Sequence, residues 1–263
     1  MSIFLKDSSF IISCAARTGS TMLVHMLRSN PEIMCHGEVF NYRNIGGLMG
    51  SYNSLRESAE HDNALLDLYR KDPNTFLYKV VFDTQDKRIA GFKIKTDEIF
   101  SRPYSRLRRL LKKDTDIKVL HLYRADLIGQ FVSLKVVHDQ TGVTLIHSDE
   151  QRPTVKPFTA DALEFQAFLK DVFKREQKSL DLYGAHRNFT ISYEEAVTAD
   201  PETLQNMQLF LGVNPKPLET TTVKILNHPT SETLLNYQEI EDIYQEVAMK
   251  RPINLLTDSA GVE

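Results

Sequence analysis

The sequence predicts an α/β fold in which helices flank a central, mostly parallel sheet. Short apolar runs at 10–12, 89–94 and 118–123 have the length of strands that are buried inside a sheet. Segments with helical spacing of apolar residues lie between these runs, as in open α/β sheets. The 263 residues suffice for one large domain, and no linker rich in Pro, Gly or Ser divides the chain. We therefore expect a single domain over residues 1–263.

The first strand and the first helix lie within the segment 10–29, FIISCAARTGSTMLVHMLRS. Gly19 relieves the turn between them, and Ser20 or Thr21 can cap a helix whose inner face carries Leu23, Met26 and Leu27. A helix that begins there directs unpaired backbone N–H groups and the positive end of its dipole at the loop. We expect the loop to bind an anion, a phosphate or a sulfate.

This loop is related to the P-loop pattern G-x-x-x-x-G-K-[ST], which gives the predicted fold its P-loop-like character. Alignment on Gly19 and Thr21 puts Cys14 at the first glycine and Ser20 at the phosphate-binding lysine. Arg17 is then the strong cation inside the turn, and its planar fork can hold two oxygens of a tetrahedral anion. The alternative is a capped turn with a surface arginine.

Composition narrows the function classes. With 32 basic and 35 acidic residues the net charge is −3, which gives no global attraction to nucleic acid or to an anionic membrane. No stretch has the length of a membrane span or of a signal peptide. Cys14 and Cys35 are too few for a disulfide framework, so we expect a cytoplasmic protein. We find no zinc-type Cys/His spacing.

The segment after the first helix, which ends near Asn30, shows little periodicity from 32 to 50. It contains His36 and Glu38, and it can face the Arg17 loop if it leaves the carboxyl end of a strand. A mostly polar helix is expected over 55–71. The short run 76–82 suits a helix or a strand equally.

A second candidate anion site follows the strand 118–123. Arg124 stands at the end of that strand, and Ser133 lies about two turns along the helix predicted over 126–138. Both can reach one anion only if it lies beside the helix, and Ser133 alone can equally be a small polar residue at a helix contact. The basic helix 103–113 can be a nucleic-acid patch, but a solvated face is favoured because aromatic residues are missing from it.

The remaining elements are predicted from their spacing and caps. The segment 140–157 is a long loop of the kind that forms lids or binding segments. A helix over 160–183, a strand over 189–192 and a helix over 201–211 follow, the last of these with Asp200 as its cap and Gly212 at its end. After a polar loop, a final helix is expected from Ser231 to about Lys250.

These motifs resemble those of sulfotransferases that use 3′-phosphoadenosine 5′-phosphosulfate (PAPS), in particular the carbohydrate and bacterial trehalose-type members. The loop 16–21 resembles the family's 5′-phosphosulfate loop, and VLHLYRADLIGQFVSLKVV resembles its 3′-phosphate motif. The segments SYEEAVTADPETLQNMQLFLGV and LLNYQEI are similar to two weaker family elements. Ala125 departs from the trehalose-type pattern, where a second arginine is usual, and leaves Arg124 as the main 3′-phosphate cation.

The resemblance implies roles for particular residues. Those assigned to the donor PAPS, and to its product 3′-phosphoadenosine 5′-phosphate (PAP), are Arg17, Thr18, Gly19, Ser20, Thr21, Arg124 and Ser133. Glu38 matches the general base of the trehalose-type members, and burial is expected to raise its proton affinity. His36 is the alternative base, because the hormone-type members use histidine. Lys93 is a candidate for steadying the sulfuryl group or, equally, a surface lysine at a strand end.

The sequence thus predicts a sulfotransferase that acts on a hydroxyl of a carbohydrate or another small metabolite, without a metal ion and without a nucleic-acid partner. A homodimer is left open, and the acceptor is not specified. Two alternatives remain: a nucleotide or adenylylsulfate kinase, disfavoured by Ser20 at the lysine position, and a non-catalytic nucleotide-binding relative.

Overall fold

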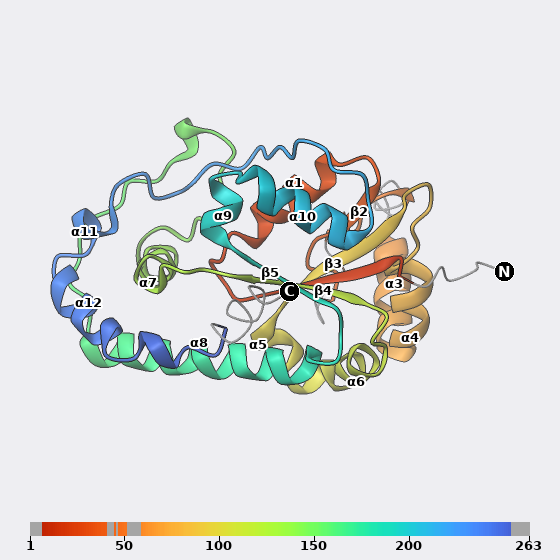
Figure 1. Ribbon diagram of the computed structural model, residues 1–263, viewed down its shortest axis with the longest axis horizontal. Helices are drawn as coiled ribbons and strands as arrows, with labels where there is room; N and C mark the ends of the chain where they lie inside the picture. Colours follow the sequence, from red (N-terminus) through yellow and green to blue (C-terminus); the bar gives the residue numbers. More distant parts are fainter. Residues whose placement is uncertain (1–6, 41–44, 46, 52–58, 254–263) are drawn as a thin grey trace.

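A central five-stranded sheet organises the molecule (Figure 1). The computed structural model describes residues 7–40, 45, 47–51 and 59–253. Its strands are β1 (Ser9–Cys14), β2 (Ile33–His36), β3 (Ile89–Lys95), β4 (Lys118–Tyr123) and β5 (Asn188–Ser192). They are arranged in the order β2-β3-β1-β4-β5, and every pairing is parallel. The predicted α/β class with a parallel sheet is confirmed.

The register of the strands places the functional loops at one edge of the sheet. β1 lies between β3 and β4, with Ile12 opposite Lys93 on one side and Leu120 on the other. Because all the strands are parallel, their carboxyl ends meet at one edge. The residues that follow β1, β2 and β4, among them Arg17, Glu38 and Arg124, therefore leave the sheet on the same side, where open α/β sheets bind their ligands.

Helices cover both faces of the sheet (Figure 1). On one face lie α1 (Ser20–Ser29), α9 (Tyr193–Val197) and α10 (Pro201–Leu211), and on the other α5 (Thr96–Ile99), α6 (Ser105–Lys113) and α8 (Ala162–Tyr183). At one end of the sheet are α3 (Ala59–Lys71) and α4 (Pro73–Phe76), and at the other α7 (Leu127–Lys135), α11 (Thr230–Thr233) and α12 (Tyr237–Gln245). Short 3₁₀ and π-helical turns complete the described elements at Leu77–Val81, Arg102–Tyr104, Val136–Thr141, Asp149–Gln151 and Ala248–Lys250.

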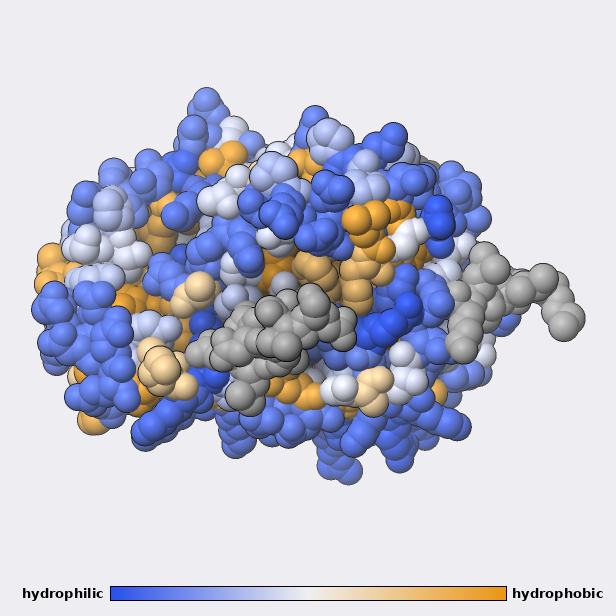
Figure 2. All heavy atoms as spheres, viewed as in Figure 1, coloured by the Kyte–Doolittle hydropathy of each residue, from blue (hydrophilic) through white to orange (hydrophobic). Residues whose placement is uncertain are grey.

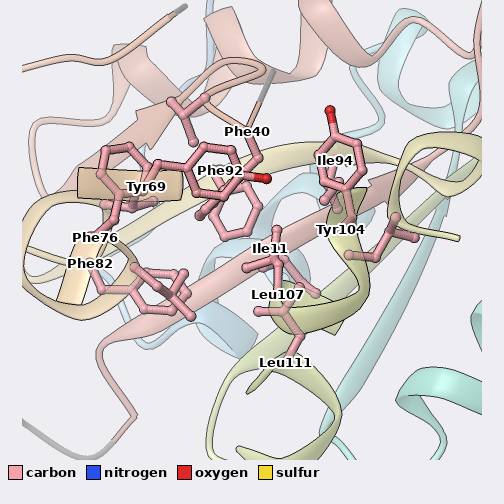
Figure 3. Close-up of a cluster of buried hydrophobic side chains, with 14 of the residues drawn as sticks. Ile11, Phe40, Tyr69, Phe76, Phe82, Phe92, Ile94, Tyr104, Leu107 and Leu111 are labelled. Atoms are coloured by element: carbon pink, nitrogen blue, oxygen red, sulfur yellow. The ribbon is translucent and has the colours of Figure 1, made fainter. Parts of the chain in front are cut away.

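An aromatic cluster fills the core beside β3 (Figure 3). The ring of Phe40 lies 4.8 Å from that of Phe92, 5.2 Å from Tyr69 and 5.4 Å from Phe76, measured between centroids. Such edge-to-face and tilted contacts add about 0.5–1.5 kcal/mol per pair beyond the burial of apolar area. Phe40 comes two residues after Glu38, so this packing fixes the chain just beyond the proposed base. The face in Figure 2 is mostly hydrophilic, with smaller apolar groups between the polar residues.

Several predicted elements need correction. The aperiodic segment 32–50 contains β2, a four-residue strand too short for a period to appear. The ambiguous run 76–82 is helical: the first turn of α4, capped by Asp72, continues into a π-helical turn over Leu77–Val81. The final helix is not continuous from Ser231 to Lys250. Its path breaks between α11 and α12 at the extended residue Leu234, and the Asn236 amide is bonded to the backbone of Ala160.

Other elements follow the sequence closely. α10 spans Pro201–Leu211, with the Asp200 side chain accepting from the Thr203 N–H and Gly212 in the left-handed region at φ 84°. α8 begins at Ala162, two residues into its predicted span, and is capped by Asp161. The short helix α9 was not predicted, although Ser192 and Glu195 form a capping box at its start. Among the described helices, none combines the length and the apolar character needed to cross a bilayer.

Candidate active site

The loop after β1 has the backbone of an anion-binding turn. Arg17 and Gly19 adopt left-handed conformations, with φ of 62° and 72°, before α1 begins at Ser20. Neither Ser20 nor Thr21 caps the helix, contrary to the prediction; Gly19 occupies the cap position, and no capping side chain is found for the first turn in the described part of the chain. The N–H groups of this turn therefore lack a side-chain acceptor and are free to meet an anion.

Gly19 is required for steric as well as conformational reasons. A Cβ at this position would lie 2.3 Å from Cδ2 of Tyr193, which is far inside contact distance. The same Tyr193 ring lies 4.8 Å from the Arg124 guanidinium. Tyr193, the first residue of α9, thus joins the loop to the end of β4, a role that the sequence did not suggest although it lies in the quoted SYEE segment.

One cavity of about 270 Å³ joins the two predicted anion sites. Its lining includes Arg17, Gly19, Ser20 and Thr21 from the loop and α1, with Arg124 and Ser133 from β4 and α7. The sequence predicts the Arg17 loop and the Arg124–Ser133 pair as separate anion sites, whereas in the structure both line the same cavity. Thr18 does not line this cavity; its hydroxyl donates to the Ala15 carbonyl at 2.8 Å and so shapes the loop itself.

Among the described residues, the two arginines of the cavity are only weakly paired with carboxylates. Arg17 Nε donates to Ser133 Oγ at 3.1 Å, and Nη1 donates to the Thr144 carbonyl at 2.9 Å. Arg124 is 8% exposed, and it forms long ion pairs from Nη2 to Asp126 at 3.6 Å and from Nε to Glu194 at 3.9 Å. Among the described residues, its Nε has no hydrogen-bond partner. Burial, followed by the charge of Arg124, lowers the pKa of Arg17. An anion between the two cations would relieve this repulsion.

A second charged group lies beside the loop, where β2 and β3 end. The Glu38 carboxylate contacts Lys93 Nζ at 2.9 Å and Lys95 Nζ at 2.8 Å. Lys93 also donates to Thr21 Oγ1 at 3.1 Å, which links Glu38 to the first turn of α1. Lys93 is 6% exposed, so the alternative of a surface lysine is wrong. Lys95, which the sequence did not single out for the site, is half-buried.

The proton affinity of Glu38 differs from the prediction. Burial raises its pKa, but the charges and hydrogen bonds of Lys93 and Lys95 outweigh burial and hold the pKa below its ordinary value. The pKa of Lys95 is raised, because its bond to Glu38 outweighs the effect of burial. Glu38 is therefore ionised at neutral pH.

Comparison with known proteins identifies the family. The model of the Stf0 sulphotransferase family matches residues 9–234, which include every loop described above. The chain belongs to this family. A sulfotransferase from Alicyclobacillus acidocaldarius has the same fold, with a TM-score of 0.52 at 15% identity over 95% of each chain. A sulfotransferase domain from the curacin biosynthetic pathway gives a TM-score of 0.50 at 14% identity, covering 91% of this chain and 97% of that one. A search of curated proteins finds no significant match.

His36 of this sulfotransferase is enclosed in the protein interior. It is fully buried, Nε2 lies 3.0 Å from the Val81 carbonyl, and Nδ1 accepts from the Met49 N–H at 3.0 Å. Burial lowers its pKa to about 4, so the ring is neutral and its one N–H is directed at Val81. Both ring nitrogens are thus engaged inside the protein, and the alternative of His36 as the base does not fit this geometry.

Two further segments line the cavity of this sulfotransferase. Thr144 and Leu145 come from the predicted loop 140–157, and residues 220 and 222–226 come from the segment before α11. An antiparallel bridge joins Ile146 to Val223, and Arg152 donates to the Lys224 and Ile225 carbonyls. The segment 140–157 therefore contributes to the cavity lining beside Arg17, and its role as a lid or binding segment stays a prediction. Among the described residues, no group of His, Cys, Asp and Glu is arranged to hold a metal ion.

Proposed function

We propose that this sulfotransferase uses PAPS as its donor and transfers the sulfuryl group to a hydroxyl of a carbohydrate or another small molecule, with Glu38 as general base. The observation that carries the donor assignment is the single cavity with a cation at each of two places: Arg17 at the start of α1 and Arg124, whose Nε has no hydrogen-bond partner among the described residues. PAPS carries an anionic group at each of two matching places, the 5′-phosphosulfate and the 3′-phosphate.

The 5′-phosphosulfate is assigned to the start of α1. There the N–H groups of the first turn, the Ser20 and Thr21 hydroxyls and Arg17 surround one end of the cavity. Positive charge held in place stabilises the charge that develops on the leaving phosphate oxygen. The 3′-phosphate is assigned to Arg124 and Ser133, and a charge-assisted bond there would satisfy the buried Arg124 Nε.

The chemistry is an in-line transfer between two oxygens. The acceptor hydroxyl loses its proton to the Glu38 carboxylate, its oxygen forms a bond to sulfur, and the bond between sulfur and the 5′-phosphate oxygen breaks to release PAP. In the ligand-free state the two lysines weaken Glu38 as a base. A phosphosulfate at the first turn of α1 draws Lys93, already bonded to Thr21, toward its own oxygens. This weakens the attraction on Glu38 and raises the pKa of the carboxylate as the donor binds.

Transfer of ³⁵S-labelled sulfate from PAPS to a panel of sugars and other hydroxyl compounds tests this proposal. We expect labelled product from at least one acceptor, and turnover that is unchanged by EDTA. Binding of PAP without transfer across the panel would favour the non-catalytic relative. Magnesium-dependent phosphate transfer from ATP would favour the kinase.

We place the reaction in the cytoplasm, since Cys14 and Cys35 are free and buried, as in proteins kept under reducing conditions.

A further inference from the structure

Three successive carbonyl groups of the loop after β1 are each held by a donor. The Thr18 hydroxyl donates to the Ala15 carbonyl at 2.8 Å, and the Gln130 side-chain amide donates to the Ala16 carbonyl at 2.7 Å. Arg124 Nη1 lies 3.4 Å from the Arg17 carbonyl. The Gln130 bond is the shortest of the three, and its donor comes from α7, far along the chain.

These bonds decide which polar groups of the loop meet an anion. A carbonyl oxygen directed at a phosphosulfate would repel it, whereas N–H groups attract it. The left-handed residues Arg17 and Gly19 turn successive peptide groups so that N–H groups can gather on one side. Arg17 is not glycine, so its φ of 62° is a strained conformation that surrounding contacts must maintain. A donor fixed to the Ala16 carbonyl, directly before Arg17, supplies such a contact.

Gln130 is placed for this task without touching the cavity. Its side chain is 3% exposed, and it lines a separate small cavity of about 30 Å³ behind the loop, together with Ala15 and Thr18. One turn further along α7, Ser133 accepts from Arg17 Nε at 3.1 Å. The same helix therefore holds the backbone of Ala16 through Gln130 and the side chain of Arg17 through Ser133. α7 itself is capped at its start, where Asp126 accepts from the Gly129 N–H at 2.7 Å.

We propose that Gln130 is a positioning residue of the donor site: by donating to the Ala16 carbonyl it keeps the loop in its anion-binding conformation. This inference rests on the proposed use of PAPS. It assigns Gln130 no contact with the donor, and it requires the side chain to be a hydrogen-bond donor rather than a filler of the right shape. An amide meets that requirement, and an ionised carboxylate of the same shape does not.

The test measures the affinity for PAP by calorimetry at pH 8 in the wild type, Gln130→Met and Gln130→Glu. Methionine keeps the length of the side chain and removes the donor, and we expect PAP to bind about tenfold more weakly. Glutamate keeps the shape and, where it is ionised, sets an acceptor against the Ala16 carbonyl, so PAP should bind more weakly than to the wild type. In turnover, the KM for PAPS should rise in both variants, while the KM for the acceptor and kcat at saturating PAPS stay close to the wild type.

Gln208 provides the matched control. It is a glutamine of similar burial, 1% exposed, that accepts from Asn30 and the Lys216 N–H away from the cavity. Gln208→Met and Gln208→Glu should lower the thermal stability without changing the affinity for PAP. Wild-type affinity in Gln130→Met would overturn the inference, because shape alone would then suffice. If the wild type itself fails to bind PAP, the proposed function fails instead.

Discussion

The two sides of the active site manage their charges in opposite ways. On the donor side, Arg17 and Arg124 lie close enough for their charges to interact, and the carboxylates nearest to Arg124 are 3.6 and 3.9 Å away. On the acceptor side, the Glu38 carboxylate has a lysine ammonium at 2.9 Å and another at 2.8 Å. The two guanidinium groups of the donor side are therefore only weakly paired and can bind an anion. On the acceptor side the Glu38 carboxylate is already paired inside the protein, and we propose that it becomes an effective base only when a ligand competes for the lysines.

The largest expected effect comes from removing the base. Glu38→Gln keeps the shape of the side chain and abolishes its capacity to take a proton, so kcat should fall by about 10²- to 10⁴-fold. The affinity for PAP should not fall, since Glu38 is not among the cavity-lining residues and its loss leaves Lys93 free to bind the anion. Single-turnover transfer from PAPS measures the rate of the chemical step, and calorimetry measures the affinity for PAP. Full turnover in Glu38→Gln would show that the base has been assigned wrongly.

A smaller effect is expected on the donor side from Arg17. Arg17→Ala removes the guanidinium from the start of α1 and should weaken PAP binding by about 10- to 100-fold. Arg17→Lys retains the charge without the planar fork and should fall between alanine and the wild type. The exposed Arg109 on α6 offers a matched control, because Arg109→Ala removes an equal charge away from the cavity. Equal affinity of Arg17→Ala and Arg109→Ala for PAP would remove Arg17 from the donor site.

The lysine beside the base should shift a pH profile. The charge of Lys93 contributes most to lowering the pKa of Glu38 against the effect of burial, so Lys93→Met should raise that pKa. A base with a higher pKa is protonated at higher pH, and the acidic limb of kcat/KM should therefore move to higher pH. Lys112→Met, at an exposed position of α6, serves as the control. A limb that stays in place in Lys93→Met would mean that Lys93 does not set the proton affinity of Glu38.

The smallest effect on activity is expected at His36. His36→Gln should change kcat by about twofold at most, because both ring nitrogens bond inside the protein and away from the reacting atoms. A tenfold loss of kcat in the folded variant would return His36 to the reaction.

The free energy of unfolding should depend on pH through the same residue. Burial lowers the pKa of His36 from 6.5 to about 4, so the unfolded chain takes up the proton at a higher pH than the folded chain. Its contribution is complete above pH 6.5 and declines toward pH 4, which urea unfolding measures.

Much of the fold could be predicted from local patterns. Buried strands such as β1 and β4 are continuous apolar runs, and α10 carries both its cap at Asp200 and its stop at Gly212. β2 was missed because four residues between a helix and an aperiodic loop carry no period, and its pairing with β3 is a long-range contact. The last helix breaks at Leu234 because of tertiary bonds between Asn236 and Ala160, which spacing cannot reveal.

The sequence indicated which residues line the cavity, but it did not indicate the surroundings that set the pKa of Glu38. The loop, Arg124 and Ser133 were chosen by motif, and they line one cavity. The state of Glu38 was not predictable, because Lys93 and Lys95 reach it from a neighbouring strand and reverse the effect of burial on its pKa. Tyr193 and Gln130 act through contacts with Gly19 and the Ala16 carbonyl, and a single sequence carries no signal for such contacts.

The most direct test of the donor site compares two ligands that differ only in the 3′-phosphate. PAP and adenosine 5′-monophosphate would be titrated calorimetrically into the wild type and into Arg124→Ala. Both ligands share the 5′ end, so any indirect effect of Arg124 on the Arg17 loop cancels in the comparison. The account predicts that the wild type prefers PAP by more than about tenfold and that Arg124→Ala loses most of this preference. An equal loss of affinity for both ligands would contradict the assignment of Arg124 to the 3′-phosphate.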